Sequence, residues 1–122
     1  MNITDTVIDL IYIPRKFEDL GNVSIYSLLR DSGYFETYSE ISESTIREGL
    51  RAHPETVDDW MRFSEDKRTN AGWYFRPSRK GYEVGYFSRF QGDMKSAHYS
   101  DRTEACAVFI KNEIEEIRIK GE

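Results

Sequence analysis

The stretch from Gly72 to Phe87 limits the possible folds of this chain more than any other. Two short runs rich in aromatic and β-branched residues, 72–77 and 82–88, flank a basic loop that Gly81 closes. This pattern is typical of a β-hairpin. Aromatic side chains on paired strands stack across the pair and offer an apolar face that a helix can cover. We therefore expect a sheet built on this hairpin, with Gly85 marking a close backbone approach or a bulge.

The end of the chain supplies a third strand and a covering helix. Residues 94–99 are expected to pair with the open edge of the hairpin. Asp101 and Glu104 have the spacing of a capping box, and apolar residues recur behind them at helical intervals. This pattern predicts a helix over 101–118 that lies across one face of a short antiparallel three-stranded sheet.

The middle of the first half carries helix-start signals. Ser24 stands where an N-cap is expected, ahead of apolar residues spaced along one helical face. Further helices are expected to begin at Ser42 or Ser44 and at Pro54, since proline is tolerated in a first helical turn. We expect the last two helices to form an αα-hairpin.

Residues 2–13 fit either a helix or a strand. Their apolar residues are dense but lack a clear period, and we favour a helix that Pro14 ends. N-terminal helices, a sheet and a covering helix together define an α+β fold. A length of 122 residues suits a single domain over 1–122.

Charge is unevenly divided along the chain. Residues 1–66 hold 14 Asp and Glu against 6 Lys and Arg, a net of −8, while residues 67–122 hold 8 against 11, a net of +3. The two values give the overall −5. An acidic half argues against nucleic acid as a partner, because phosphate binding needs clustered cations. It suits a basic protein partner, although acidic helices can also be merely solvated.

The expected cellular compartment of the protein follows from signals that the sequence lacks. The longest apolar stretch, 7–13, carries Asp9 and is far shorter than the roughly 20 residues of a membrane span. The first residues do not resemble a secretory signal, and the single Cys106 has no partner for an internal disulfide. We therefore expect a cytoplasmic protein that does not bind membranes.

Signals for catalysis or for a cofactor are weak. His53, His98 and Cys106 are the only borderline or soft metal ligands, and their spacing matches no zinc motif. Cys106 falls on the apolar stripe of its helix, which favours a structural role. No nucleophile motif, phosphate-binding loop or dinucleotide fingerprint occurs. We expect no metal, no cofactor, no small-molecule substrate and no enzymatic activity.

A resemblance adds to these observations. The segments that carry it are Ser64–Arg68, Gly72–Phe75, Tyr82–Tyr86 and Asp101–Ile110. In size, charge, element order and aromatic hairpin, the chain from Ser24 onward resembles small bacterial immunity proteins. These are the cognate antitoxins of contact-dependent growth inhibition and other polymorphic toxin systems. The resemblance implies a cytoplasmic, non-enzymatic protein that binds one toxin domain, often a nuclease, and occludes its active site. It assigns no binding residues, because immunity interfaces differ from toxin to toxin.

The expected contact surface is the outward side of the αα-hairpin. An acidic face there could dock on the basic substrate groove of a nuclease toxin. Tyr34 or Tyr38, if exposed, could supply aromatic anchors. The carboxylates predicted to bind are Glu43, Glu48, Glu55, Asp58, Asp59, Glu65 and Asp66.

Two other function classes stay open at this point. An adaptor module would use the aromatic hairpin as its contact surface. A small enzyme would need His53 or His98 in a pocket beside a carboxylate.

Overall fold

The computed structural model describes residues 2–67, 71–88 and 95–121, and it confirms the α+β fold. The elements, in chain order, are α1 (Ile3–Ile11), α2 (Ile13–Leu20), α3 (Ile25–Asp31), α4 (Tyr34–Thr37), the 3-10 turn η1 (Tyr38–Glu40), α5 (Glu43–Ala52), α6 (Glu55–Asp66), β1 (Ala71–Ser78), β2 (Gly81–Ser88), β3 (Ser96–Tyr99) and α7 (Arg102–Lys120).

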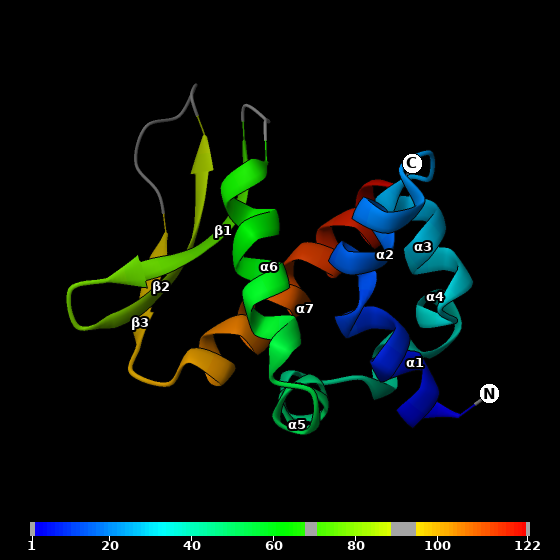
Figure 1. The fold of residues 1–122 in the computed structure, drawn as a ribbon, viewed down its shortest axis with the longest axis horizontal. Coiled ribbons are helices and arrows are strands. Elements are labelled where there is room, and N and C mark those ends of the chain that lie inside the picture. The colour runs from blue at the N-terminus through cyan, green and yellow to red at the C-terminus, as the bar shows by residue number, and fades with distance from the viewer. Residues whose placement is uncertain (1, 68–70, 89–94, 122) are drawn as a thin grey trace.

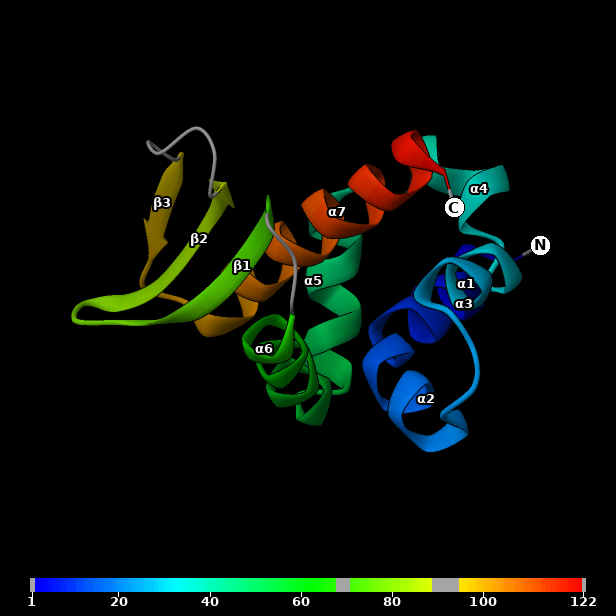
Figure 2. The same ribbon diagram turned by 90° about the horizontal axis from the view of Figure 1, so that it is seen from above.

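Helix α7 joins the two ends of the molecule. Figure 1 shows the sheet at one end and α1–α4 at the other, with α7 running between them. Figure 2 shows the same arrangement from above, with α5 and α6 packed beside α7. Helix α7 contacts all three strands as well as α3, α5 and α6. Its buried stripe, which includes Cys106, Phe109 and Ile114, therefore forms the centre of the core.

The first residues are helical, which confirms the helix that we favoured for 2–13. Asn2 is its N-cap, and the Asn2 side chain accepts a hydrogen bond from the Thr4 N–H at 2.9 Å. Pro14 was expected to end this helix, and that expectation is wrong. Helix α1 ends at Ile11, and Pro14 lies in the first turn of α2, where the missing N–H costs nothing.

Two of the serine caps act as the sequence indicates. The Ser24 and Ser42 hydroxyls accept hydrogen bonds from the Ser27 and Thr45 N–H groups at 3.0 and 3.2 Å. The predicted αα-hairpin is not formed, because the chain changes direction sharply at His53-Pro54, between α5 and α6. Figure 1 shows α5 end-on, whereas α6 lies in the plane of the view and runs from top to bottom.

The predicted sheet is present, with strand order β1-β2-β3 and both pairs antiparallel. Strands β1 and β2 are joined by a two-residue loop, Arg79-Lys80. Strand β3 starts at Ser96, and position 94 of the predicted third strand lies outside the described residues. Asp101 caps α7 as predicted, and the helix continues to Lys120, two residues beyond the expected end.

Helix α6 covers the outer edge of β1. The Phe75 N–H donates to Ser64 Oγ at 2.7 Å, and Lys67 Nζ donates to the Trp73 carbonyl at 2.9 Å. Pro77 has no N–H to leave unpaired on this edge. An edge occupied in this way is protected from pairing with other chains.

Gly85 lies under the Tyr74 ring, which accounts for the glycine in the middle of a strand. A Cβ at this position would lie 2.5 Å from Tyr74 Oη and 2.6 Å from the Lys95 carbonyl oxygen. We expect Gly85→Ala to lower the free energy of unfolding by about 1–3 kcal/mol, because the ring or β3 must move. Urea denaturation measures this change. The control is Ala97→Ser on the exposed part of β3, expected to change stability by less than about 0.5 kcal/mol, and an equal effect of both would contradict this account.

Candidate functional site

The seven carboxylates predicted to bind are spread over α5 and α6, and not all of them remain free for a partner. Glu55 and Glu65 stand ten residues apart on α6, about 15 Å along the helix axis. Several of the seven are already engaged by other residues of the chain. Glu48 pairs with Arg51 at 3.0 Å, Asp58 pairs with Arg102, and Glu55 accepts a hydrogen bond from the Tyr12 hydroxyl at 2.9 Å.

Asp59 was expected to face solvent, and that expectation is wrong. Its side chain is 5% exposed and pairs with Arg62 at 2.8 Å and with Arg15 at 3.0 Å. Position 59 faces α2, and no local pattern in the sequence places Arg15 on a neighbouring helix. Asp59 therefore links α6 to α2, so its replacement by lysine would place three cations together.

Tyr34 was a predicted anchor only if its ring is exposed, and it is completely buried. Its hydroxyl donates to Glu115 Oε2 at 2.5 Å and accepts from Lys111 Nζ at 2.9 Å. Burial and then the Glu115 carboxylate raise the pKa of Tyr34, so it stays protonated at neutral pH. Tyr38 is 38% exposed, with the Arg118 guanidinium 3.7 Å from its ring centre. Of the two tyrosines, Tyr38 alone offers an exposed ring.

The same cluster predicts a pH effect on stability. Arg118 donates to both Glu115 oxygens at 2.8 and 3.0 Å, and this bonding lowers the pKa of Glu115 in the folded chain. A carboxyl whose folded pKa is lowered stabilises the fold above its unfolded pKa and loses that effect as the pH falls. We expect the free energy of unfolding to fall from about pH 7 to about pH 3.5, and to fall less in Glu115→Gln.

Urea denaturation at both pH values tests this effect. Glu40→Gln, which changes an exposed carboxyl on η1, should leave the fall unchanged. An identical fall in Glu115→Gln and in the unmodified chain would contradict the role of Glu115.

The end of α6 carries acids that are still available. Glu65 and Asp66 are exposed, as are Glu18 and Asp19 at the end of α2. None of these four forms an ion pair with another residue in the described part of the chain. Glu43 is likewise exposed and unpaired among the described residues, but it lies on α5. Of the predicted carboxylates, Glu65 and Asp66 are therefore the two free ones that stand together.

A hollow lies on each side of this helix end. The hollow toward α2 measures about 240 Å³, and its lining includes Phe17, Phe63 and Asp66. The hollow toward β1 measures about 400 Å³, and its lining includes Glu65 and Tyr74. We call residues 62–66 of α6 together with these two hollows the α6 surface.

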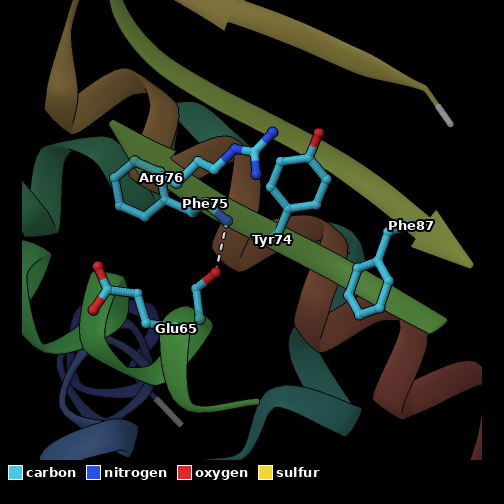
Figure 3. Close-up of a pocket in the computed structure, with 6 residues that line it drawn as sticks. Glu65, Tyr74, Phe75, Arg76 and Phe87 are labelled. Carbon is cyan, nitrogen blue, oxygen red and sulfur yellow. Dashed lines mark hydrogen bonds between the residues drawn. The ribbon is translucent and has the colours of Figure 1, made fainter. Parts of the chain in front are cut away.

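The β1-side hollow is aromatic, as Figure 3 shows. Glu65 on α6 lies across it from Tyr74 and Phe87, which come from β1 and β2. The Arg76 guanidinium lies 4.8 Å from the centre of the Tyr74 ring. Glu83 accepts from the Tyr74 hydroxyl at 2.5 Å and from Arg76 at 3.1 Å, which lowers the pKa of Glu83. On the sheet side of this hollow, the polar groups of Tyr74 and Arg76 are already bonded to Glu83. The hollow therefore presents mainly ring surface to a partner.

The groups singled out for chemistry lie apart from the α6 surface. His53 ends α5 and lies in hydrogen-bond contact with the Tyr12 hydroxyl, with Nδ1 3.1 Å from it, while His98 is exposed on β3. Burial raises the pKa of the Cys106 thiol, which stays protonated at neutral pH. Within residues 2–67, 71–88 and 95–121, no three His, Cys, Asp or Glu side chains gather as a metal site would require.

Two further findings concern the chain rather than one surface. None of the helices in the described part of the chain has the length and apolar character that a membrane span needs. Comparison of the chain with protein-family models, with curated proteins and with solved structures finds no match. The geometry of the α6 surface is therefore the basis for a functional proposal.

The α2 contribution to this surface was missed at the sequence level. Phe17 and Leu20 are 41% and 57% exposed, with Glu18 and Asp19 between them. Apolar residues three apart beside a helix-ending Gly21 were the available signal. The sequence does not show that α2 packs on α6, so it does not connect Phe17 and Leu20 with Glu65 and Asp66.

Proposed function

We propose that this protein is a bacterial immunity protein of a contact-dependent growth inhibition or other polymorphic toxin system. In this proposal it acts in the cytoplasm without enzymatic activity of its own. It binds a basic toxin domain, such as a nuclease, through the α6 surface and occludes the toxin's active site.

The observation that carries the proposal is the pairing of free acids with exposed apolar side chains. Asp66 and Glu18 line one hollow together with the accessible Phe17, and Glu65 lines the hollow on the other side of the same helix end. Free carboxylates steer a cationic partner toward the surface and raise the association rate. Exposed aromatic and aliphatic side chains supply the apolar anchor that a stable interface needs. A nuclease groove, which is cationic because its substrate is anionic, complements this combination.

A growth assay tests the proposal. The toxin candidate is the product of a large gene directly upstream of the gene for this chain. Cells that make its toxin domain should stop growing, and co-expression of this protein should restore growth. Glu65→Lys/Asp66→Lys should abolish or strongly reduce protection, because the two substitutions reverse the charge without entering the core.

A matched control separates location from total charge. Glu36→Lys/Glu40→Lys makes the same change in net charge at exposed positions of α4 and η1. This variant should protect as well as the unmodified protein. Full protection by Glu65→Lys/Asp66→Lys would contradict the assignment of the α6 surface.

An adaptor that binds through the hairpin is the second candidate, supported by the open aromatic hollow at Tyr74 and Phe87. Trp73 and Tyr82 are less suited to this role, because they pack against the core on the side of the sheet that faces α7. Loss of partner binding in Phe87→Ala, with normal binding in Glu65→Lys/Asp66→Lys, would favour the adaptor.

A further inference from the structure

We propose that the hollow between α2 and α6 receives one arginine side chain of the partner. The inference rests on the proposed function, since it names the group that this surface recognises. Its three supports are the size of the hollow, its aromatic and apolar walls, and its surplus of carboxylates.

The size of the hollow suits a single side chain. At about 240 Å³ it is smaller than the roughly 300–1,000 Å³ of pockets that hold whole small molecules. Pro14 and Phe17 of α2 form one wall, and Phe63 of α6 forms another. Phe63 is fixed by edge-to-face contact with the buried Trp60, at 5.4 Å between ring centres. Phe17 is 41% exposed, so its ring is accessible to an incoming group.

The charges of the hollow favour a cation. Glu18 and Asp66 line it without ion pairs to any residue that the structure describes. The buried Asp59 also lines it, and its Oδ2 is ion-paired with Arg15 at 3.0 Å. Arg62 is held by the other Asp59 oxygen. Three carboxylates therefore face two guanidinium groups, before the neighbouring Asp19 and Glu65 add further negative charge.

Other occupants fit less well. An anionic group would meet Glu18 and Asp66 at short range, and an apolar side chain would cover these carboxylates without pairing them. A lysine ammonium group would pair with the carboxylates, but it has no planar group that could stack on the aromatic walls. The planar guanidinium of arginine stacks on aromatic rings and bonds to carboxylates through two parallel hydrogen bonds.

The test is a titration of the full ¹⁵N-labelled chain, followed by amide chemical shifts. The probe is Nα-acetyl-arginine amide, and the comparison is Nα-acetyl-citrulline amide, which has the same shape but no charge. The arginine probe should produce saturable shifts centred on the amides of Phe17, Phe63 and Asp66. The citrulline probe should produce none that saturate.

Variants locate the binding. Asp66→Asn should weaken the arginine probe about two- to fivefold, as expected for loss of one exposed ion pair, and Phe17→Ala should weaken it further. Glu40→Gln should leave the affinity unchanged. Equal shifts with both probes, shifts centred on Tyr74 and Phe87, or no effect of Asp66→Asn would each overturn the proposal.

This outcome is separable from that of the proposed function. The titration uses no toxin, whereas protection is measured from growth. Absence of saturable arginine binding in a chain that still protects cells would remove the arginine site and leave the immunity function standing.

Discussion

Replacing Glu113 by alanine is expected to lower the free energy of unfolding by about 3–5 kcal/mol. The Glu113 carboxylate lies 2.9 Å from Lys67 Nζ, and the two side chains are 7% and 11% exposed. Lys67 also donates to the Trp73 carbonyl, so the pair ties α7 to the end of α6 and to β1. Removing the carboxylate leaves a largely buried ammonium group with one neutral partner. Burial raises the pKa of Glu113, and Lys67 opposes that rise.

Urea denaturation near neutral pH measures the loss. The double variant Lys67→Met/Glu113→Leu serves as a control, because it removes both charges and retains apolar volume. It should recover most of the stability lost in Glu113→Ala. A loss below about 1 kcal/mol in Glu113→Ala would show that the pair is not effectively buried.

Replacing Trp60 by alanine is expected to lower the free energy of unfolding by about 3–5 kcal/mol, because apolar contacts are lost and a cavity is created. Trp60 is 1% exposed and packs edge-to-face on Phe63 and on Phe109 of α7. Its Nε1–H donates to the Ile11 carbonyl at the end of α1 at 3.0 Å. One side chain thus connects α6 with both α1 and α7.

Two variants separate the contributions of Trp60. Trp60→Phe keeps an aromatic ring but leaves the Ile11 carbonyl without this donor, and we expect a loss of about 1–3 kcal/mol. Ile119→Ala changes a side chain that is 71% exposed, and it should lower the free energy of unfolding by less than about 0.5 kcal/mol. Similar urea midpoints for Trp60→Ala and Ile119→Ala would contradict the position of Trp60 in the core.

The elements predicted correctly are those with local signals. The hairpin is specified by its aromatic alternation and by Gly81, which has a φ of 142°. Helix α7 is specified by the Asp101 cap and its apolar stripe. The close approach at Gly85 was predictable because a glycine weakens the interior of a strand unless a neighbouring group needs the space of its missing side chain.

The errors arise where tertiary contacts decide. Asp59 was expected to face solvent, and Tyr34 was a candidate anchor on the condition that its ring is exposed. The structure buries them because Arg15 and Glu115 supply partners from helices that are remote in sequence. Asp58 was counted among the free acids for the same reason, since local spacing does not reveal that Arg102 pairs with it.

The central claim is that the α6 surface captures a cationic partner, and association kinetics test it most directly. The partner is the toxin domain identified by the growth assay, mixed with this protein at low and high salt. Glu65→Lys/Asp66→Lys should reduce the association rate constant about tenfold or more at low salt, and the difference should shrink at high salt. Glu36→Lys/Glu40→Lys should associate much faster than that variant. Equal rate constants at low salt for the unmodified protein and Glu65→Lys/Asp66→Lys would contradict the claim.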